Sequence, residues 1–349
     1  MPLLRSIDPK NRLTLMGFQK KKNTKYYLRF DLGTVIKISN RKTKILSFWG
    51  KGGVGKTTCA ASASIYFASK GYKVLILTSD PTPSLSDIFD EQIGTMAKKL
   101  APGLEAIELN EEAVLNMWKQ RFGDEVYKVV SSFFPVEKDI LDYISGAPGI
   151  SDEFMLAYIL DLYTSGKYDY IIWDAAPAGG SLRLLKIEEK FYKHLGEASK
   201  LYLSLKSTLD KIRRAEGKDP LKIIGDWRKL AEDVLELISS PVFSIYLVAI
   251  PEWLGFSQTR RILSELREFN VKVPGLIINQ VAVEDVCNCD IWMKKVKIHD
   301  KYVNMLKETY GSSMEVIVVP IQSYEIKGIE ALRKFSRNLS ALLDKQLTT

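Results

Sequence analysis

The sequence contains few of the residues that build disulfides and metal sites. There are three cysteines and two histidines among 349 residues. Three cysteines in a chain of this length exclude a disulfide framework, so we expect a reducing compartment, the cytoplasm. No run of about eighteen apolar residues occurs, so we expect no membrane-spanning helix. The first residues have no apolar stretch behind their basic side chains, which excludes a secretory signal.

Most of the chain also lacks an excess of positive charge, although the formal net charge is +8. Residues 1–44 carry twelve basic and two acidic side chains, whereas the other 305 residues carry 38 basic and 40 acidic ones. We therefore expect no nucleic-acid partner for the body of the protein. Residues 1–43 are interpreted as a basic N-terminal extension, preferably flexible. A small hairpin over 25–39 is the alternative.

What the sequence does contain is a series of short apolar, β-branched runs separated by helical stretches. The runs cover residues 44–50, 73–79, 168–176, 242–250, 273–280 and 314–320. Strands that are buried on both faces and alternate with helices predict an α/β fold with a mostly parallel, doubly wound sheet. In such sheets, ligands bind beyond the carboxyl ends of the strands.

Two segments interrupt this alternation. Residues 110–166 and 185–240 have the periodicity of amphipathic helices, with no strand between them. We expect them to form a helical subdomain inserted into one domain that spans residues 44–345. Their apolar faces either close on each other as a core or stay partly open for a client, and the periodicity does not separate these alternatives.

The stretch FWGKGGVGKTTCA at residues 48–60 matches the pattern G-x-x-x-x-G-K-[ST] between a predicted strand and a predicted helix. Its backbone N–H groups and the helix N-terminus predict a phosphate nest for ATP. Lys56 is expected to neutralise the β- and γ-phosphates, Thr57 to ligate Mg²⁺ and Thr58 to donate to the α-phosphate. The predicted ATP-binding residues of this loop are Gly50, Lys51, Gly52, Gly53, Val54, Gly55, Lys56, Thr57 and Thr58.

Lys51 is a second lysine that the pattern does not require. In a face-to-face homodimer it would reach the nucleotide of the partner chain and act in trans, as an arginine finger does. We therefore predict a catalytic role for Lys51. A solvated surface lysine is the alternative.

This variant loop resembles the signature of a class that contains the nitrogenase iron protein, the partition and division-site ATPases and the arsenical pump-driving ATPases. Other stretches resemble one branch, the arsenical-pump and tail-anchored-protein-targeting ATPases. They are SDPTPSLSDIF (79–89) as the first switch, WDAAPAGGSLRLL (173–185) as the second switch, IINQ (277–280) and VPIQSYEIKGIEALRKFS (319–336) around adenine, and APGISDEF (147–154) before the client helix. The resemblance spans residues 45–345 and implies a P-loop ATPase.

The resemblance also implies roles for individual residues. Asp80 corresponds to the catalytic carboxylate that orients or deprotonates the attacking water. Asp174 is the strand-end acid that holds Mg²⁺. Asn279, Pro320 and Ile321 correspond to residues that bind the adenine.

The first switch departs from the family pattern at two positions. Pro83 and Ser84 stand where the family has His and Asn. These changes leave the phosphate ligands intact and alter how the switch couples to the dimer and to a client.

Cys287 and Cys289 follow the adenine strand. The targeting branch has C-x-x-C there, where two subunits share one Zn²⁺, and four thiolates around zinc would join a dimer. Here the spacing is C-x-C. Shared zinc and a free, redox-labile pair therefore both stay open.

The preferred function is that of a homodimeric ATPase, because one chain has a single glycine loop and two chains are needed to pair two sites. It would bind or drive a membrane-associated client, either a hydrophobic membrane protein or a membrane pump. Residues 100–245 contain only Met117 and Met155, which weakens the case for a methionine-rich client groove. The alternatives are a positioning ATPase on DNA or membrane, and an iron–sulfur carrier that uses Cys287 and Cys289.

Overall fold

A mostly parallel sheet of eight strands forms the centre of the protein, in the order β10-β9-β8-β3-β7-β4-β6-β5. The computed structural model describes residues 27–29, 35–37, 43–78, 84–134, 136–147, 150–175, 193, 196–197, 199–200, 220–287 and 289–348. The strands of the sheet are β3 (Lys44–Gly50), β4 (Val74–Thr78), β5 (Lys98–Ala101), β6 (Leu104–Glu108), β7 (Tyr170–Asp174), β8 (Phe243–Ala249), β9 (Gly275–Val281) and β10 (Glu315–Pro320).

All neighbouring strands are parallel except β5 and β6, which pair antiparallel at one edge. The predicted α/β fold is thereby confirmed. The sequence analysis missed β5 and β6. Strand β5 is short and begins with two lysines, which an edge strand tolerates because it is solvated, so it gives no apolar run.

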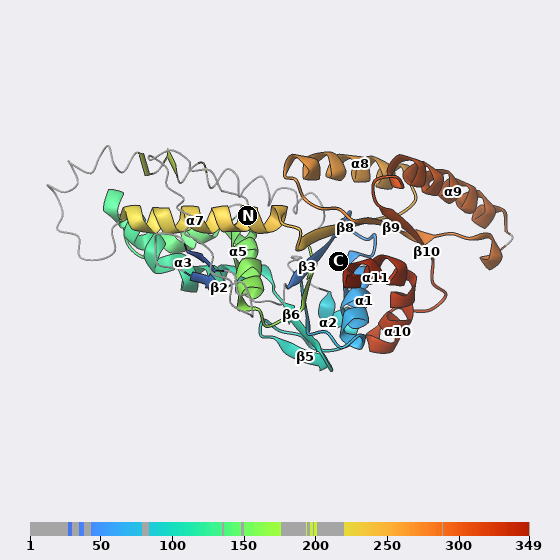
Figure 1. Cartoon of the computed structure of the whole chain (residues 1–349), viewed down its shortest axis with the longest axis horizontal. Coiled ribbons are helices and arrows are strands. Elements are labelled where there is room, and N and C mark those ends of the chain that lie inside the picture. Colours follow the sequence, from blue (N-terminus) through green and yellow to red (C-terminus); the bar gives the residue numbers. More distant parts are fainter. Residues whose placement is uncertain are drawn as a thin grey trace, which may run out of the picture.

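Helices cover both faces of the sheet, as a doubly wound fold requires (Figure 1). Side chains of β3 alternate between the two faces, with Ile45 and Trp49 in one core and Leu46 and Phe48 in the other. The helices of the first core include α8 (Trp253–Glu268) and α9 (Asp290–Tyr310). The helices of the second core are α1 (Lys56–Ser69), α2 (Leu85–Phe89), α10 (Gly328–Ser336) and α11 (Ser340–Thr348). Two short 3₁₀ helices are also present, η1 (Glu284–Val286) and η2 (Arg337–Leu339).

A group of helices extends from one end of the sheet, on the left of Figure 1. Its members are α3 (Glu111–Phe133), α4 (Ile140–Ser145), α5 (Ile150–Ser165) and α7 (Pro220–Ser239). The indole nitrogen of Trp227 on α7 donates to Glu125 on α3 at 3.1 Å. Most of the predicted helical segment between residues 185 and 219 lies outside the described residues.

These helices enclose an apolar cavity of about 220 Å³. Its lining is Trp118, Phe122, Val126, Val130, Ile144, Ile150, Phe154, Ala157, Trp227, Leu230, Ala231 and Val234. The apolar faces of the described helices are therefore not completely filled by one another.

Two short strands lie in the N-terminal extension, β1 (Tyr27–Arg29) and β2 (Val35–Lys37). They pair antiparallel, with Tyr27 opposite Lys37 and Arg29 opposite Val35. Among the described helices, none is both long enough and apolar enough to cross a membrane.

Candidate phosphate-binding site

The glycine loop joins the end of β3 to the start of α1. Gly50 lies so close to β8 that a Cβ atom would be 2.2 Å from the carbonyl oxygen of Val248. Gly53 and Gly55 have φ angles of 80° and 94°, a left-handed conformation that glycine adopts without steric strain. The local sequence therefore determines a tight turn that exposes its amides ahead of the helix.

Two side chains from the carboxyl end of β9 support this loop. The amide nitrogen of Asn279 donates to the carbonyl of Val54 at 2.9 Å, and only 5% of Asn279 is exposed. The amide nitrogen of Gln280 lies 3.4 Å from the carbonyl oxygen of Gly53. Asn279, which the resemblance assigns to adenine, thus holds the phosphate loop in this structure.

A hydroxyl and a carboxylate meet just after the loop. Thr57 on α1 donates to Asp174 at the end of β7, with 2.8 Å between Oγ1 and Oδ2. The hydroxyl of Thr78, at the end of β4, lies 3.3 Å from the Asp174 backbone oxygen. Asp174 is 1% exposed. The nearby side chain of Lys56 is also buried, and its amine donates to the Lys51 carbonyl at 3.2 Å.

The donor set suits a magnesium ion. Mg²⁺ prefers hard oxygen ligands and is usually held by one or two protein oxygens together with phosphate and water. The Thr57 hydrogen points to Asp174, which leaves the lone pairs of the Thr57 hydroxyl available to a metal. The residues present therefore fit the ion that an ATPase requires.

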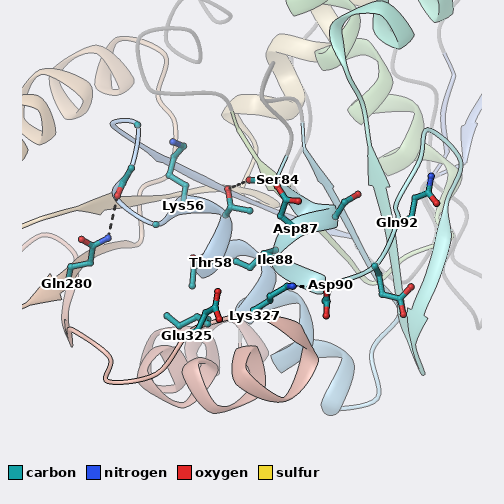
Figure 2. Close-up of a pocket in the computed structure, with 17 residues that line it drawn as sticks. Lys56, Thr58, Ser84, Asp87, Ile88, Asp90, Gln92, Gln280, Glu325 and Lys327 are labelled. Carbon is teal, nitrogen blue, oxygen red and sulfur yellow. Dashed lines mark hydrogen bonds and ion pairs between the residues drawn. The ribbon is translucent and has the colours of Figure 1, made fainter.

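A cavity of about 1100 Å³ opens beside this pair. Figure 2 shows Lys56 and Gln280 on one side, Asp87 and Gln92 on the other, and Glu325 and Lys327 below. The lining residues are Gly52, Gly53, Gly55, Lys56, Thr57, Thr58, Ser84, Ser86, Asp87, Ile88, Asp90, Glu91, Gln92, Gln280, Glu325, Ile326 and Lys327. The cavity volume is slightly above the range of about 300–1,000 Å³ that is typical of small-molecule sites.

Several residues of this cavity were not found from the sequence. Lys327, in the loop before α10, forms an ion pair with Asp90 after α2 at 2.8 Å. Gln280 is adjacent to Asn279 in the IINQ stretch, and nothing in that stretch distinguished which amide faces the cavity. No local sequence pattern could have identified either residue, because each one contacts a segment that is distant in the sequence.

Other predicted site residues do not line the cavity. Lys51 is exposed and borders a separate small hollow with Trp49 and Leu254. Pro320 and Ile321 are also absent from the cavity wall, and the Ile321 amide donates to the Val281 carbonyl at 2.9 Å. The predicted catalytic residue, Asp80, lies outside the described residues.

The three cysteines differ in their surroundings. Cys59 on α1 is buried, and burial, together with the nearby charge of Asp174, raises the pKa of its thiol. Cys289 is exposed, and a hydrogen bond with Cys287 lowers its pKa. Within the described part of this single chain, no three His, Cys, Asp or Glu side chains are grouped as a metal site would need.

Comparisons with known proteins agree with this geometry. The model of a family described as anion-transporting ATPase matches residues 43–341. An "ATPase GET3" from Komagataella phaffii is 27% identical over 315 residues, which cover 86% of this chain and 91% of the relative. A "Putative arsenical pump-driving ATPase 2" from Aquifex aeolicus is 29% identical over 308 residues, with 85% and 99% covered. The "ATPase ASNA1 homolog 1" of Paramecium tetraurelia is 27% identical over 315 residues, with 85% and 92% covered.

The family match extends over most of the chain, and it includes the glycine loop, the strand-end carboxylate and the parallel sheet that joins them. The chain therefore belongs to the anion-transporting ATPase family and is an ATP-hydrolysing enzyme of the P-loop α/β fold.

Proposed function

We propose that this chain binds MgATP in the cavity beside the glycine loop and hydrolyses it as a homodimer that serves a membrane-associated client. The observation that carries the proposal is that the glycine loop, Lys56 and Thr57 line one cavity, and that Thr57 is hydrogen-bonded to the buried carboxylate of Asp174 behind it. The loop, Lys56 and Thr57 follow the end of β3, and Asp174 ends the neighbouring strand β7, at the edge of the sheet where ligands of parallel sheets bind.

The loop amides and Lys56 have separate roles in binding the phosphates. The backbone amides of residues 52–58 bind phosphate oxygens, and the amine of Lys56 turns from the Lys51 carbonyl to the β- and γ-phosphates. Thr57 and Asp174 would hold Mg²⁺, and the ion would supply positive charge to the phosphates. Asp80 is proposed to orient or deprotonate the attacking water.

The position of Lys51 supports a role for a second chain. Its side chain is exposed and lies outside the lining of its own nucleotide cavity. A contribution of Lys51 to phosphate transfer therefore requires another subunit facing the loop. Stabilisation of transition-state charge by such a group contributes roughly 10³- to 10⁵-fold in rate.

Subunit mixing tests both assignments. We expect Lys51→Ala and Asp80→Asn to bind ATP and to hydrolyse it poorly when each is present alone. In the mixed dimer, one site keeps its own Asp80 and receives Lys51 from the other chain, so part of the activity should return. Lys73→Ala, which removes another exposed lysine, is the control and should keep its activity. Heterodimers that recover no activity would exclude the role in trans.

The apolar cavity among α3, α4, α5 and α7 supports the client part of the proposal. Its described lining is entirely aliphatic or aromatic, so it suits an apolar helix or side chain and not a polar ligand. Of the two clients considered, a hydrophobic membrane protein and a membrane pump, the cavity favours the first, because its described lining offers an apolar surface and no charged side chain.

Two neighbouring valines on α3 provide a matched test of client binding. Val130 lines the cavity, and Val129 does not, although both are half-buried. Val130→Glu should abolish cross-linking to a synthetic apolar transmembrane peptide, whereas Val129→Glu should retain it. Equal binding by both variants would remove the cavity from the proposal and leave the ATPase assignment intact.

A further inference from the structure

Ser84 places a third oxygen beside the Thr57–Asp174 pair. It is the residue immediately before α2, and its hydroxyl donates to Thr57 Oγ1 at 3.3 Å. Thr57 in turn donates to Asp174 at 2.8 Å. In Figure 2 a dashed line marks the hydrogen bond that the Ser84 hydroxyl makes with Thr57 beside the cavity. Three oxygens from the starts of two helices and the end of one strand thus form a continuous chain.

The orientation of this hydroxyl differs from that of an ordinary capping serine. A serine at the start of a helix usually accepts a hydrogen bond from an amide of the first turn. Ser84 makes no such side-chain cap, although its carbonyl accepts the Ile88 amide at 3.1 Å. Its hydroxyl is turned to Thr57 instead, so helix capping does not explain its direction.

Glu108 fixes the place of Ser84. The Glu108 carboxylate, at the end of β6, accepts the amide of Leu85 at 2.8 Å and that of Ser86 at 3.2 Å. It also accepts the hydroxyl of Ser86. The Leu85 side chain is fully buried. The backbone that follows Ser84 is therefore anchored to the sheet, and the position of its hydroxyl is built into the fold.

We propose that Ser84 is a further ligand of the Mg²⁺ that accompanies the nucleotide. The inference rests on the proposed function of this cavity in MgATP binding. Neighbouring ligands of an octahedral Mg²⁺ are about 3.0 Å apart, because each lies about 2.1 Å from the ion. The oxygens of Ser84 and Thr57 are 3.3 Å apart, so a small approach brings both to the ion.

The hydrogen-bond directions agree with this role. The Thr57 hydrogen stays on Asp174, and the Thr57 lone pair that now accepts the Ser84 hydrogen becomes the one that faces the metal. The Ser84 hydroxyl, no longer bonded to Thr57, can then donate its hydrogen to a phosphate oxygen or a water. A lone pair of the Ser84 oxygen faces the ion. No proton leaves either hydroxyl in this rearrangement.

Release of a fluorescent ADP analogue, measured against Mg²⁺ concentration, tests the proposal without relying on turnover. In wild-type protein Mg²⁺ should slow release, because the ion links the nucleotide to the protein. Ser84→Ala should raise the Mg²⁺ concentration for half-maximal slowing about 10-fold, a typical effect of weakening the coordination of a site. Affinity for the analogue in EDTA should be unchanged, since the loop amides and Lys56 remain.

Two control variants separate coordination from general damage. Ser84→Thr keeps the hydroxyl and should retain the wild-type Mg²⁺ dependence. Ser69→Ala removes an exposed serine hydroxyl at the far end of α1 and should also match the wild type.

Each remaining outcome overturns the inference. An unchanged Mg²⁺ dependence in Ser84→Ala removes Ser84 from the metal site while nucleotide binding stands. If Ser84→Ala loses as much affinity for the ADP analogue in EDTA as it does with Mg²⁺, the role of Ser84 is structural. Wild-type protein that binds no nucleotide, with or without Mg²⁺, refutes the proposed function itself and the inference with it.

Discussion

Replacing Gly55 with alanine should destabilise the folded protein by two separable effects. The residue has a φ angle of 94°, and a side chain in the left-handed region costs roughly 1–2 kcal/mol. In addition, the new Cβ would lie 2.4 Å from the amide nitrogen of Asn279. Asn279 must then move away from the Val54 carbonyl, and the loss of that hydrogen bond costs about 1 kcal/mol or more. The sum is about 2–4 kcal/mol.

The other glycines of the loop provide graded controls. Gly53 has a φ angle of 80°, and no atom lies within 4 Å of the position that a Cβ would take there. Gly53→Ala should therefore show only the conformational cost, roughly 1–2 kcal/mol. Gly52 has neither a left-handed φ angle nor a close neighbour, and Gly52→Ala should change stability by about 0.5 kcal/mol at most.

The assay is the free energy of unfolding in urea, measured without nucleotide so that binding does not contribute. Combining Gly55→Ala with Asn279→Ala should destabilise the protein by less than the sum of the two single changes, because both remove the same hydrogen bond. The reasoning fails if Gly55→Ala is no less stable than Gly53→Ala, or if the double variant is fully additive.

Three further predictions concern the cysteines and a buried histidine. Hydrogen bonding lowers the pKa of Cys289, and burial raises that of Cys59. Iodoacetamide should therefore modify Cys289 in native protein and leave Cys59 unmodified, as read by mass spectrometry. Faster modification of Cys59 than of Cys289 would contradict these environments. If Cys287 and Cys289 of two chains share Zn²⁺, chelation should shift the dimer toward monomer in light scattering, and metal-free protein purified under reducing conditions would exclude the site. Burial, with Lys295 nearby, lowers the pKa of His299, so the unfolded chain takes up a proton that the folded chain does not. The free energy of unfolding should therefore fall as the pH drops below about 6.5 toward the folded-state pKa. In His299→Gln, the free energy of unfolding in urea should depend less on pH across that range.

The parts of this protein that depend on short-range chemistry could be predicted from its sequence. The glycine loop could be predicted because three of its glycines meet a local demand: Gly53 and Gly55 have left-handed φ angles, and Gly50 lies in close contact with strand β8. The central strands are readable because both of their faces are buried, which requires continuous apolar runs. Even the meeting of Thr57 with Asp174, 117 residues apart, follows from the rule that parallel strands bring their carboxyl ends together.

The choice between two neighbouring side chains of similar chemistry, in contrast, depends on tertiary contacts. Asn279 supports the loop and Gln280 faces the cavity because the positive φ angle at Gln280 turns the backbone between them. Glu108 anchors the residues after Ser84 through a strand that has no apolar run of its own, so no sequence pattern marked it. Such contacts join segments far apart in the chain, and each residue's type is compatible with many partners. Packing selects one of those partners, which is why local patterns located the site and the fold completed it.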